Sequence, residues 1–507
     1  MTKLKMLFYG INGTGLGHIS RLLNIAEASE ELLLALQIRP EIYFLTTSEA
    51  PWVSSQYPTY KIPSKTIVSG SHSDNKTYIS HAHFFVSNLT ALFRPDILIM
   101  DTMPQGSFGE MTSMIPFCKQ KVFINRHKNA DVSQDEIHQR HLALYDLVLT
   151  PDQLASSASY SLPQKIADKN VFTGFIHGYY PEKVLDRAST REALGVTADE
   201  KLIYISAGGG GDKHAVHDLD VLVKGVLAHT QAKILVGYGP LFKGKKIYHP
   251  RVIPFTDYEV RDYFPALDAA ISAGGYNSFH ELTAAAIPTL FFAQQKGMDV
   301  QERRIQLGVD SHWNLFLENL DPYSIEESLE KLLRESEQKK LRTGLATKLP
   351  DWGSHEAASQ MLLMRSDMGK ENFVSNLYRV LNYRLAWPLI QRNNMEFALS
   401  ARIALWIEIA QTPSSKRIDS LANLHQSWKT KKADPKSSSY IQMGAQMAEL
   451  MLQNDFSEKR MKRLWVSFLK NVPLNSLEQE EIWRTFSEYF EEKLKEKHTE
   501  HTQAEKP

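Results

Sequence analysis

The chain has 507 residues, with 58 Lys and Arg residues against 58 Asp and Glu residues, and a single cysteine, Cys118. Zero formal charge argues against a broadly basic surface for nucleic acid, and one cysteine excludes an internal disulfide framework and a cysteine-cluster metal site. No apolar run approaches the roughly 18 residues of a membrane span, and the N-terminus lacks the apolar core of a signal peptide. At about 150 residues per domain, we expect a cytoplasmic protein of about three domains.

The first domain begins with an apolar run, residues 4–9, that stops at Gly10. Behind it, apolar residues recur at helical spacing from Ile19 to Ala26, which predicts a helix. Further apolar runs that predict strands follow at residues 41–47, 95–101, 121–125 and 146–150. Buried strands separated by helical stretches are typical of a doubly wound parallel sheet with helices on both faces.

A second domain repeats this pattern after residue 176. A strand at residues 201–206 is followed by four glycines and a helix, while residues 181–200 suggest a polar connection. Further strands are predicted at residues 232–239, 251–255, 267–272 and 288–293. The fold class is therefore α/β, with two Rossmann-like domains that face a cleft.

Glycines nearly vanish after about residue 355, and long amphipathic segments take their place. This change predicts a helical extension at residues 366–497 and a disordered polar tail at 498–507, after domains at 1–175 and 176–365. The extension suits an intramolecular bundle, a protein partner, or contact with the inner face of a membrane. Its role stays open.

A glycine loop, GTGLGH, lies between the first strand and the first helix and contains Gly13, Gly15, Gly17 and His18. Glycines allow close approach of a ligand, and a helix N-terminus attracts an oxyanion or phosphate. The spacing is GxGxG and the second strand ends in threonines, so a nicotinamide or flavin cofactor is disfavoured. No lysine followed by Ser or Thr closes the loop, which argues against a Walker motif.

Two further glycine segments belong to the second domain. The first is Gly208, Gly209, Gly210 and Gly211, either a flexible turn or an anion cradle. The second is Gly274 and Gly275, followed by a helix and then a strand and a loop. Polar residues expected at the carboxyl ends of these neighbouring strands are Asn277, Ser278, Glu281, Asp299 and Gln301. Ligands of open α/β sheets bind there, and such side chains accept the hydroxyls of a ribose or sugar.

Over residues 4–365 the chain resembles the GT-B glycosyltransferases, in particular the family 28-type group of the peptidoglycan N-acetylglucosaminyltransferase and the UDP-glucuronosyltransferase-like enzymes. GTGLGH resembles that group's first glycine loop, VFTGF with REALGV its interdomain passage, and SAGGGG the loop that opens its nucleotide-sugar domain. Residues 252–304 are similar to its donor signature throughout.

The resemblance implies a nucleotide-sugar donor, usually a UDP-sugar, in the second domain and an acceptor in the first. It implies that the nucleotide base lies near Phe255, that Glu281 binds the ribose, and that Asp299 and Gln301 bind the donor sugar. It places the diphosphate on Gly208–Gly211 and on Gly274, Gly275, Asn277 and Ser278. No metal and no cofactor are implied, because helix N-termini and loop amides would neutralise the diphosphate.

His18 and Asp101 are the expected catalytic pair, with His18 as general base in an inverting displacement and Asp101 as its orienting carboxylate. Each candidate also has a structural reading: His18 as a helix-start residue, Asp101 as a strand-end cap, Glu281 as a solvated helix residue. Asp299 and Gln301 could be ordinary loop residues. The chain departs from the pattern of the plant and macrolide enzymes of this group, in which a histidine that contacts the diphosphate stands where this chain has Ser272 or Ala273.

We therefore expect a hexosyltransferase that uses a UDP-sugar and an unidentified acceptor, whether lipid, glycan or small molecule. Arg126 and Lys128 could meet an anionic acceptor or form a solvated basic turn. One alternative is a non-hydrolysing nucleotide-sugar 2-epimerase, for which Asp101 and Glu110 are the few extra acidic candidates of the first domain. Another is a non-catalytic nucleotide-sugar-binding subunit. No nucleic-acid partner is expected.

Overall fold

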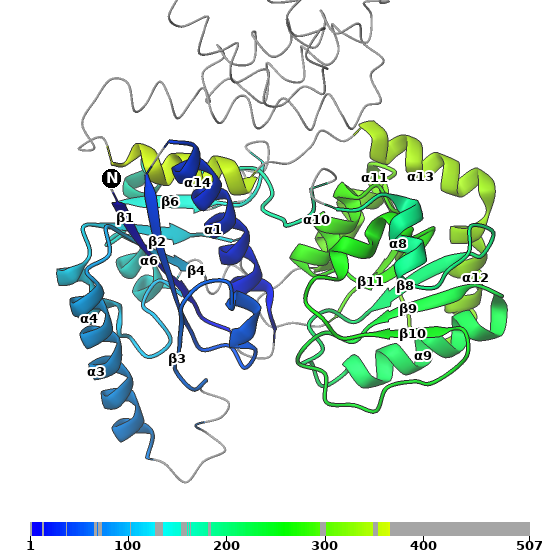
Figure 1. The fold of residues 1–507 in the computed structure, drawn as a ribbon, viewed down its shortest axis with the longest axis horizontal. Helices are drawn as coiled ribbons and strands as arrows, with labels where there is room; N and C mark the ends of the chain where they lie inside the picture. The colour runs from blue at the N-terminus through cyan, green and yellow to red at the C-terminus, as the bar shows by residue number, and fades with distance from the viewer. Residues whose placement is uncertain are drawn as a thin grey trace, which may run out of the picture. The chain divides into compact units, whose positions relative to one another are not determined.

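Alternating strands and helices form two parallel sheets in the computed structural model (Figure 1). The structure describes residues 3–12, 15–36, 38–64, 68, 74–101, 103–126, 135–153, 160, 162, 164–180, 184–294, 301–347 and 353–365. Predictions for Gly13, Lys128 and Asp299, for the extension at 366–497 and for the tail at 498–507 lie outside these residues.

Seven strands of the described chain make the first sheet, in the order β3-β2-β1-β4-β5-β6-β7, and every neighbouring pair is parallel. Its strands are β1 (Lys3–Gly10), β2 (Arg39–Thr46), β3 (Thr59–Lys61), β4 (Ile97–Asp101), β5 (Gln120–Ile124), β6 (Leu147–Thr150) and β7 (Asn170–Phe172). Its helices are α1 (Gly17–Ala35), α3 (Asn75–Phe93), α4 (Met111–Met114), α6 (Glu136–Leu142) and α7 (Gln164–Ala167), with short 3-10 helices η1 (Pro51–Ser54) and η2 (Ile115–Phe117).

The second sheet has six described strands in the order β10-β9-β8-β11-β12-β13, again all parallel. Its strands are β8 (Leu202–Ser206), β9 (Lys233–Gly237), β10 (Val252–Phe255), β11 (Ala269–Ala273), β12 (Thr289–Phe292) and β13 (Asn314–Leu317). The helices from residue 187 onward are α8 (Arg187–Ala193), α9 (Ala215–His229), η5 (Val260–Ala266), α10 (Tyr276–Ala284), α11 (Gln301–Asp310), α12 (Pro322–Leu333), α13 (Glu335–Thr347) and α14 (Gly353–Leu363).

Both sheets have the Rossmann strand order, in which the direction of strand addition reverses beside the first strand. In the first sheet this switch point lies between β1 and β4, where Gly10 is paired with Asp101. In the second it lies between β8 and β11, where Ser206 is paired with Ser272. The loops that leave these strand ends therefore start side by side in each domain, which confirms the predicted pair of Rossmann-like domains.

The strands form where the sequence is apolar because both faces of each sheet are buried. All five residues of β4, β8 and β11 are buried, and helices α9 and α12 cover the second sheet with Leu219, Leu222, Ile325 and Leu329. The sequence analysis predicted no strand at β3, β7 or β13, which have three, three and four residues respectively. It also missed α8 inside the expected polar connection, although the Asp186 side chain caps that helix through the amides of Ala188 and Ser189.

Helix α14 follows the second domain in the chain but packs against α1 of the first (Figure 1). His355 Nε2 lies 3.1 Å from Glu31 Oε2 of α1, and Arg365 Nη1 lies 2.9 Å from Asp96 Oδ1. Residues 353–365 are thus attached to the first domain, whereas their place in the sequence suggested the second. None of the helices in the described part of the chain has the length and apolarity that a membrane crossing requires.

Candidate functional site

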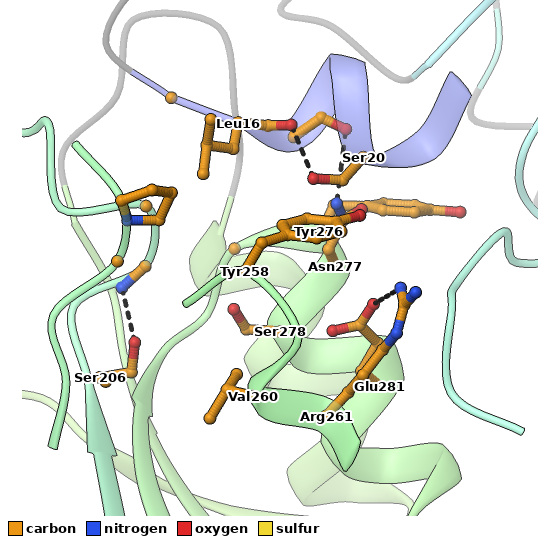
Figure 2. A pocket seen from close by; sticks show the side chains of 18 of the residues that line it. Leu16, Ser20, Ser206, Tyr258, Val260, Arg261, Tyr276, Asn277, Ser278 and Glu281 are labelled. Carbon is orange, nitrogen blue, oxygen red and sulfur yellow. Dashed lines mark hydrogen bonds and ion pairs between the residues drawn. The ribbon is translucent and has the colours of Figure 1, made fainter. Parts of the chain in front are cut away.

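A cavity of about 420 Å³ lies where the switch points of both sheets open (Figure 2). The first domain contributes the start of α1 with Gly15, Gly17 and His18, together with Arg126 after β5. The second contributes its first glycine loop, the segment before and into η5, the N-terminus of α10, and Gln301. One cavity therefore brings together residues as far apart in the chain as Gly15 and Gln301.

The glycine loop after β8 is shaped by backbone geometry that other residues rarely adopt. Gly208 and Gly210 have φ values of +84° and +80°, and a Cβ at Gly210 would lie 2.2 Å from the Tyr238 carbonyl oxygen. The Gly208 amide donates to Ser206 Oγ at 3.1 Å (Figure 2). Gly208 and Gly209 line the cavity, whereas Gly210 and Gly211 are not among its lining residues. The first two glycines thus leave room for a ligand, and Gly210 allows the turn.

Helix α10 points its N-terminus at the cavity, with Gly275 as its N-cap and Asn277 and Ser278 in its first turn. Asn277 Nδ2 donates to the Gly17 carbonyl oxygen of the first domain at 3.4 Å (Figure 2). Gly274 is not among the lining residues, and a Cβ there would lie 2.7 Å from Ile305 Cδ1. Gly274 therefore serves the packing of α11, while the helix N-terminus that follows it is a position that attracts an anion.

Glu281 lies one turn further along α10, with its side chain 15% exposed. Its Oε1 accepts from the Gly178 amide at 3.3 Å and lies 3.9 Å from Arg261 Nη1 (Figure 2). Burial raises the pKa of this carboxyl above its usual range, while Arg261 and the Gly178 amide oppose the rise. Glu281 is thus a largely buried carboxylate at the cavity wall, unlike a solvated helix residue.

Gln301, the first residue of α11, is 2% exposed and lines the cavity. Its Oε1 accepts from the Gln294 amide at 3.0 Å, and within the described residues its Nε2 has no hydrogen-bond partner. A buried amide donor without a partner is costly unless a ligand meets it. Asp299, the other expected sugar contact, lies outside the described residues.

Phe255 ends β10 but does not line the cavity. Its ring packs against Tyr263 with centroids 5.2 Å apart, and its carbonyl accepts from the Tyr238 amide at 2.9 Å. Tyr258 and Val260, a few residues further on, line the cavity instead (Figure 2). The segment after β10 therefore reaches the cavity through Tyr258 and Val260 and not through the predicted Phe255, because the chain turns after the strand.

His18 is the second residue of α1, and its side chain is 20% exposed. Its Nδ1 lies 3.4 Å from Asp101 Oδ1, so the structure brings together the two residues that the sequence analysis paired. Burial lowers the pKa of the imidazole below its ordinary value; Asp101 opposes this effect, and Arg21 and Arg126 add to it. A histidine in this setting is uncharged at neutral pH, as a general base must be.

Sequence reasoning missed Arg21, which is fully buried beside this pair. Its Nε and Nη2 donate to the two Asp101 oxygens at 2.9 and 3.2 Å, and Nη2 also lies 3.1 Å from His18 Nδ1. Its guanidinium packs over the Tyr276 ring at 5.1 Å from the centroid. The available signal was an arginine one turn after His18 among apolar residues, since a buried arginine needs a carboxylate partner.

Arg261 of η5 was missed too, and it joins the two domains. Its Nη1 lies 3.2 Å from Asn24 Oδ1 of α1 and 3.9 Å from Glu281 Oε1, and its guanidinium stacks over Tyr258. Arg261 therefore ties the first helix of one domain to the candidate ribose carboxylate of the other.

His280 of α10, by contrast, is structural, because its ring stacks on Phe175 at 3.9 Å between centroids.

Glu110, an acidic candidate of the first domain, is buried away from the cavity. It accepts hydrogen bonds from the Tyr9 hydroxyl and from the amides of Ser107 and Phe108. It therefore supports the loop after β4.

Among the described residues, His, Cys, Asp and Glu side chains do not gather in groups of three or more that could hold a metal ion.

No protein-family model and no curated protein matches the chain. Among solved structures it is similar to the spinosyn forosaminyltransferase SpnP, with 12% identity, a TM-score of 0.49, and coverage of 72% of this chain and 99% of that one. A Listeria monocytogenes structure named as a UDP-N-acetylglucosamine 2-epimerase has 11% identity, a TM-score of 0.47 and coverage of 73% and 97%. MurG of Acinetobacter baumannii has 12% identity, a TM-score of 0.45 and coverage of 71% and 100%.

With TM-scores below 0.5, these similarities carry no conclusion about activity or ligand. The fold class follows from the chain's own topology. Each sheet has the Rossmann order, and loops at both switch points line one cavity. This is the GT-B architecture.

Proposed function

We propose that the protein is an inverting glycosyltransferase that moves a hexosyl group from a nucleotide sugar, a UDP-sugar in the first instance, to an acceptor hydroxyl. One observation carries this proposal. His18, which is paired with the buried Asp101 of the first domain, lines the same cavity as a candidate donor site of the second.

The donor would lie along the second domain. The N-terminus of α10 and the amides of Gly208 and Gly209 would bind the diphosphate, since free amides and the helix dipole favour negative charge. Glu281 would accept the ribose hydroxyls, and the unpartnered Nε2 of Gln301 would donate to a sugar hydroxyl. In this arrangement the chain needs neither a metal nor a cofactor.

The reaction would be a single displacement. His18 takes the proton of the acceptor hydroxyl while that oxygen forms a bond to the anomeric carbon from the face opposite the diphosphate. The bond between the anomeric carbon and the diphosphate oxygen breaks, and its electrons leave with the nucleotide diphosphate. Charge therefore grows on the imidazole, where Asp101 stabilises it, and on the leaving group, where the α10 amides stabilise it.

Thermal melting with UDP, GDP and dTDP tests the donor site, followed by assays of UDP-sugar hydrolysis and of transfer to acceptor extracts. A ligand at 100 times its Kd stabilises the fold by about 2.7 kcal/mol, which is measurable as a rise in Tm. Glu281→Ala should remove the rise, whereas Glu302→Gln, an exposed carboxylate on the next helix, should keep it. Indifference of the melting temperature to every nucleotide would overturn the proposal.

The same assay separates the rival activities. Conversion of UDP-N-acetylglucosamine to its 2-epimer without an acceptor would replace glycosyl transfer by epimerisation. Nucleotide binding without hydrolysis, transfer or epimerisation would instead indicate a binding subunit.

A further inference from the structure

The contacts of Arg21 bear on which nitrogen of His18 carries the proton. Arg21 Nη2 lies 3.1 Å from His18 Nδ1. A guanidinium has only hydrogen-bond donors and stays protonated at any pH that a protein experiences. A hydrogen bond between these atoms therefore requires a lone pair on Nδ1.

The competing arrangement places the proton on Nδ1, where it would be donated to Asp101. That Nδ1–Oδ1 distance is 3.4 Å, longer than either bond from Arg21 to the same carboxylate, at 2.9 and 3.2 Å. Arg21 thus occupies both carboxylate oxygens and also faces the imidazole nitrogen. Because Arg21 and Asp101 are both fully buried, solvent water does not compete for these hydrogen bonds.

We propose that Arg21 is a positioning residue that holds neutral His18 with its proton on Nε2 and its lone pair on Nδ1. His18 then presents an N–H to the cavity. To act as a base, it exchanges tautomers through water: one water takes the proton of Nε2, another delivers a proton to Nδ1, and Nδ1 keeps that proton in a hydrogen bond to Asp101 Oδ1. The net charge is unchanged. This consequence for catalysis rests on the proposed function, whereas the tautomer itself does not.

Arg21 also contacts the second domain. Its guanidinium packs over Tyr276, whose hydroxyl donates to the Pro151 carbonyl and accepts from the Ile176 amide. Tyr276 is the first residue of α10, the helix that bears Glu281. The candidate donor helix and the candidate base are therefore joined through one arginine. Charged side chains that act on His18 include Arg21, Asp101 and Arg126.

Nitrogen NMR of the full chain labelled with ¹⁵N-histidine tests the tautomer directly. The chain has 18 histidines, so the His18 signals are assigned by their loss in His18→Gln. At neutral pH we expect the wild type to show a protonated Nε2 and an unprotonated Nδ1. The opposite pattern in the wild type would overturn the proposal without any mutation or activity measurement.

The variants separate charge from shape. Arg21→Met should transfer the proton to Nδ1 and move the His18 titration to higher pH, because a neighbouring cation is lost and Asp101 is released. Arg21→Lys, which keeps a charged donor, should restore the wild-type tautomer. Arg304→Met is the matched control: this guanidinium packs over the same Tyr276 ring at 5.6 Å but donates to the Gly274 carbonyl.

An unchanged tautomer and titration in Arg21→Met would contradict the proposal, as would an equal change in Arg304→Met. If Arg21→Met fails to fold, the wild-type spectrum and that of Arg21→Lys still decide. Failure of glycosyl transfer in every assay would leave this spectrum as it is, so the two proposals fail separately.

Discussion

Leu16 of the first glycine loop lies directly against Gly209 of the second: a Cβ at Gly209 would be 3.3 Å from Leu16 Cγ. The two loops leave the first strands of different Rossmann sheets, yet they line the same cavity. An enlarged side chain at Gly209 would therefore fill the space where the two domains approach each other. The glycines of the second loop therefore differ in how well they tolerate replacement by a larger residue.

Gly210→Ala should destabilise the protein more than Gly209→Ala. Gly210 has φ +80° and a Cβ there would meet the Tyr238 carbonyl at 2.2 Å, whereas a Cβ at Gly209 would come no closer than 3.3 Å to the Leu16 side chain and 3.5 Å to its backbone nitrogen. We expect Gly210→Ala to lower the free energy of unfolding by about 1–3 kcal/mol. Thermal melting of both variants without nucleotide measures the difference, and equal melting temperatures would show that the loop relaxes around a methyl group.

Glu281→Gln should stabilise the free protein at neutral pH. Because burial raises the pKa of Glu281, the ionised carboxylate is disfavoured in the folded state. A raised pKa contributes stability below the unfolded value of about 4.3, and this contribution is lost as the pH rises through the folded value. The variant should thus melt higher than the wild type at pH 7 and equally at pH 4, while its nucleotide response disappears. A lower melting temperature at pH 7 would contradict the expected sign.

Asp96→Asn should have the opposite pH dependence. Burial alone would raise the pKa of Asp96, but Lys119, the Lys5 amide and Arg365 outweigh it and hold the pKa below its usual range. The contribution is present above about pH 3.9 and is lost as the pH falls through the lower, folded value. We expect a loss of about 1–3 kcal/mol at pH 7. Asp220→Asn, which breaks an exposed pair with Lys224 on α9, should change little.

His18→Gln should reduce the rate of transfer while donor binding persists. Removal of a general base costs about 10²- to 10⁴-fold in kcat. Since burial lowers the pKa of His18, the acid limb of the wild-type profile should lie below the ordinary histidine value. His229→Gln, a substitution on α9 remote from the lining residues, controls for loss of a histidine. Unchanged kcat with normal folding would remove His18 from the mechanism.

The strands and the glycine loops could be predicted because their signals are local. A parallel strand buried on both faces reads as a short apolar run, and the glycine loops lie directly between such runs and the next helix. β3 escaped because none of its three residues is buried, whereas the sequence analysis overlooked β13, although that strand is as long and as apolar as β6. The packing of α14 on α1 escaped because it joins the ends of the described chain.

The sequence by itself determined two α/β domains and a plausible set of ligand contacts, of which His18, Asp101, Glu281 and Gln301 are largely or fully buried in the structure. Only the tertiary structure decided which charges neutralise one another. Arg21 and Asp101 are 80 residues apart, and Arg261 and Asn24 are 237 apart. At such separations, the places where strands end and helices pack decide which residues meet. A buried charge then pairs with the polar or oppositely charged group that lies within reach. The family resemblance paired His18 with Asp101 in advance, whereas Arg21 offered only the signal of an arginine among apolar residues, which does not name its partner.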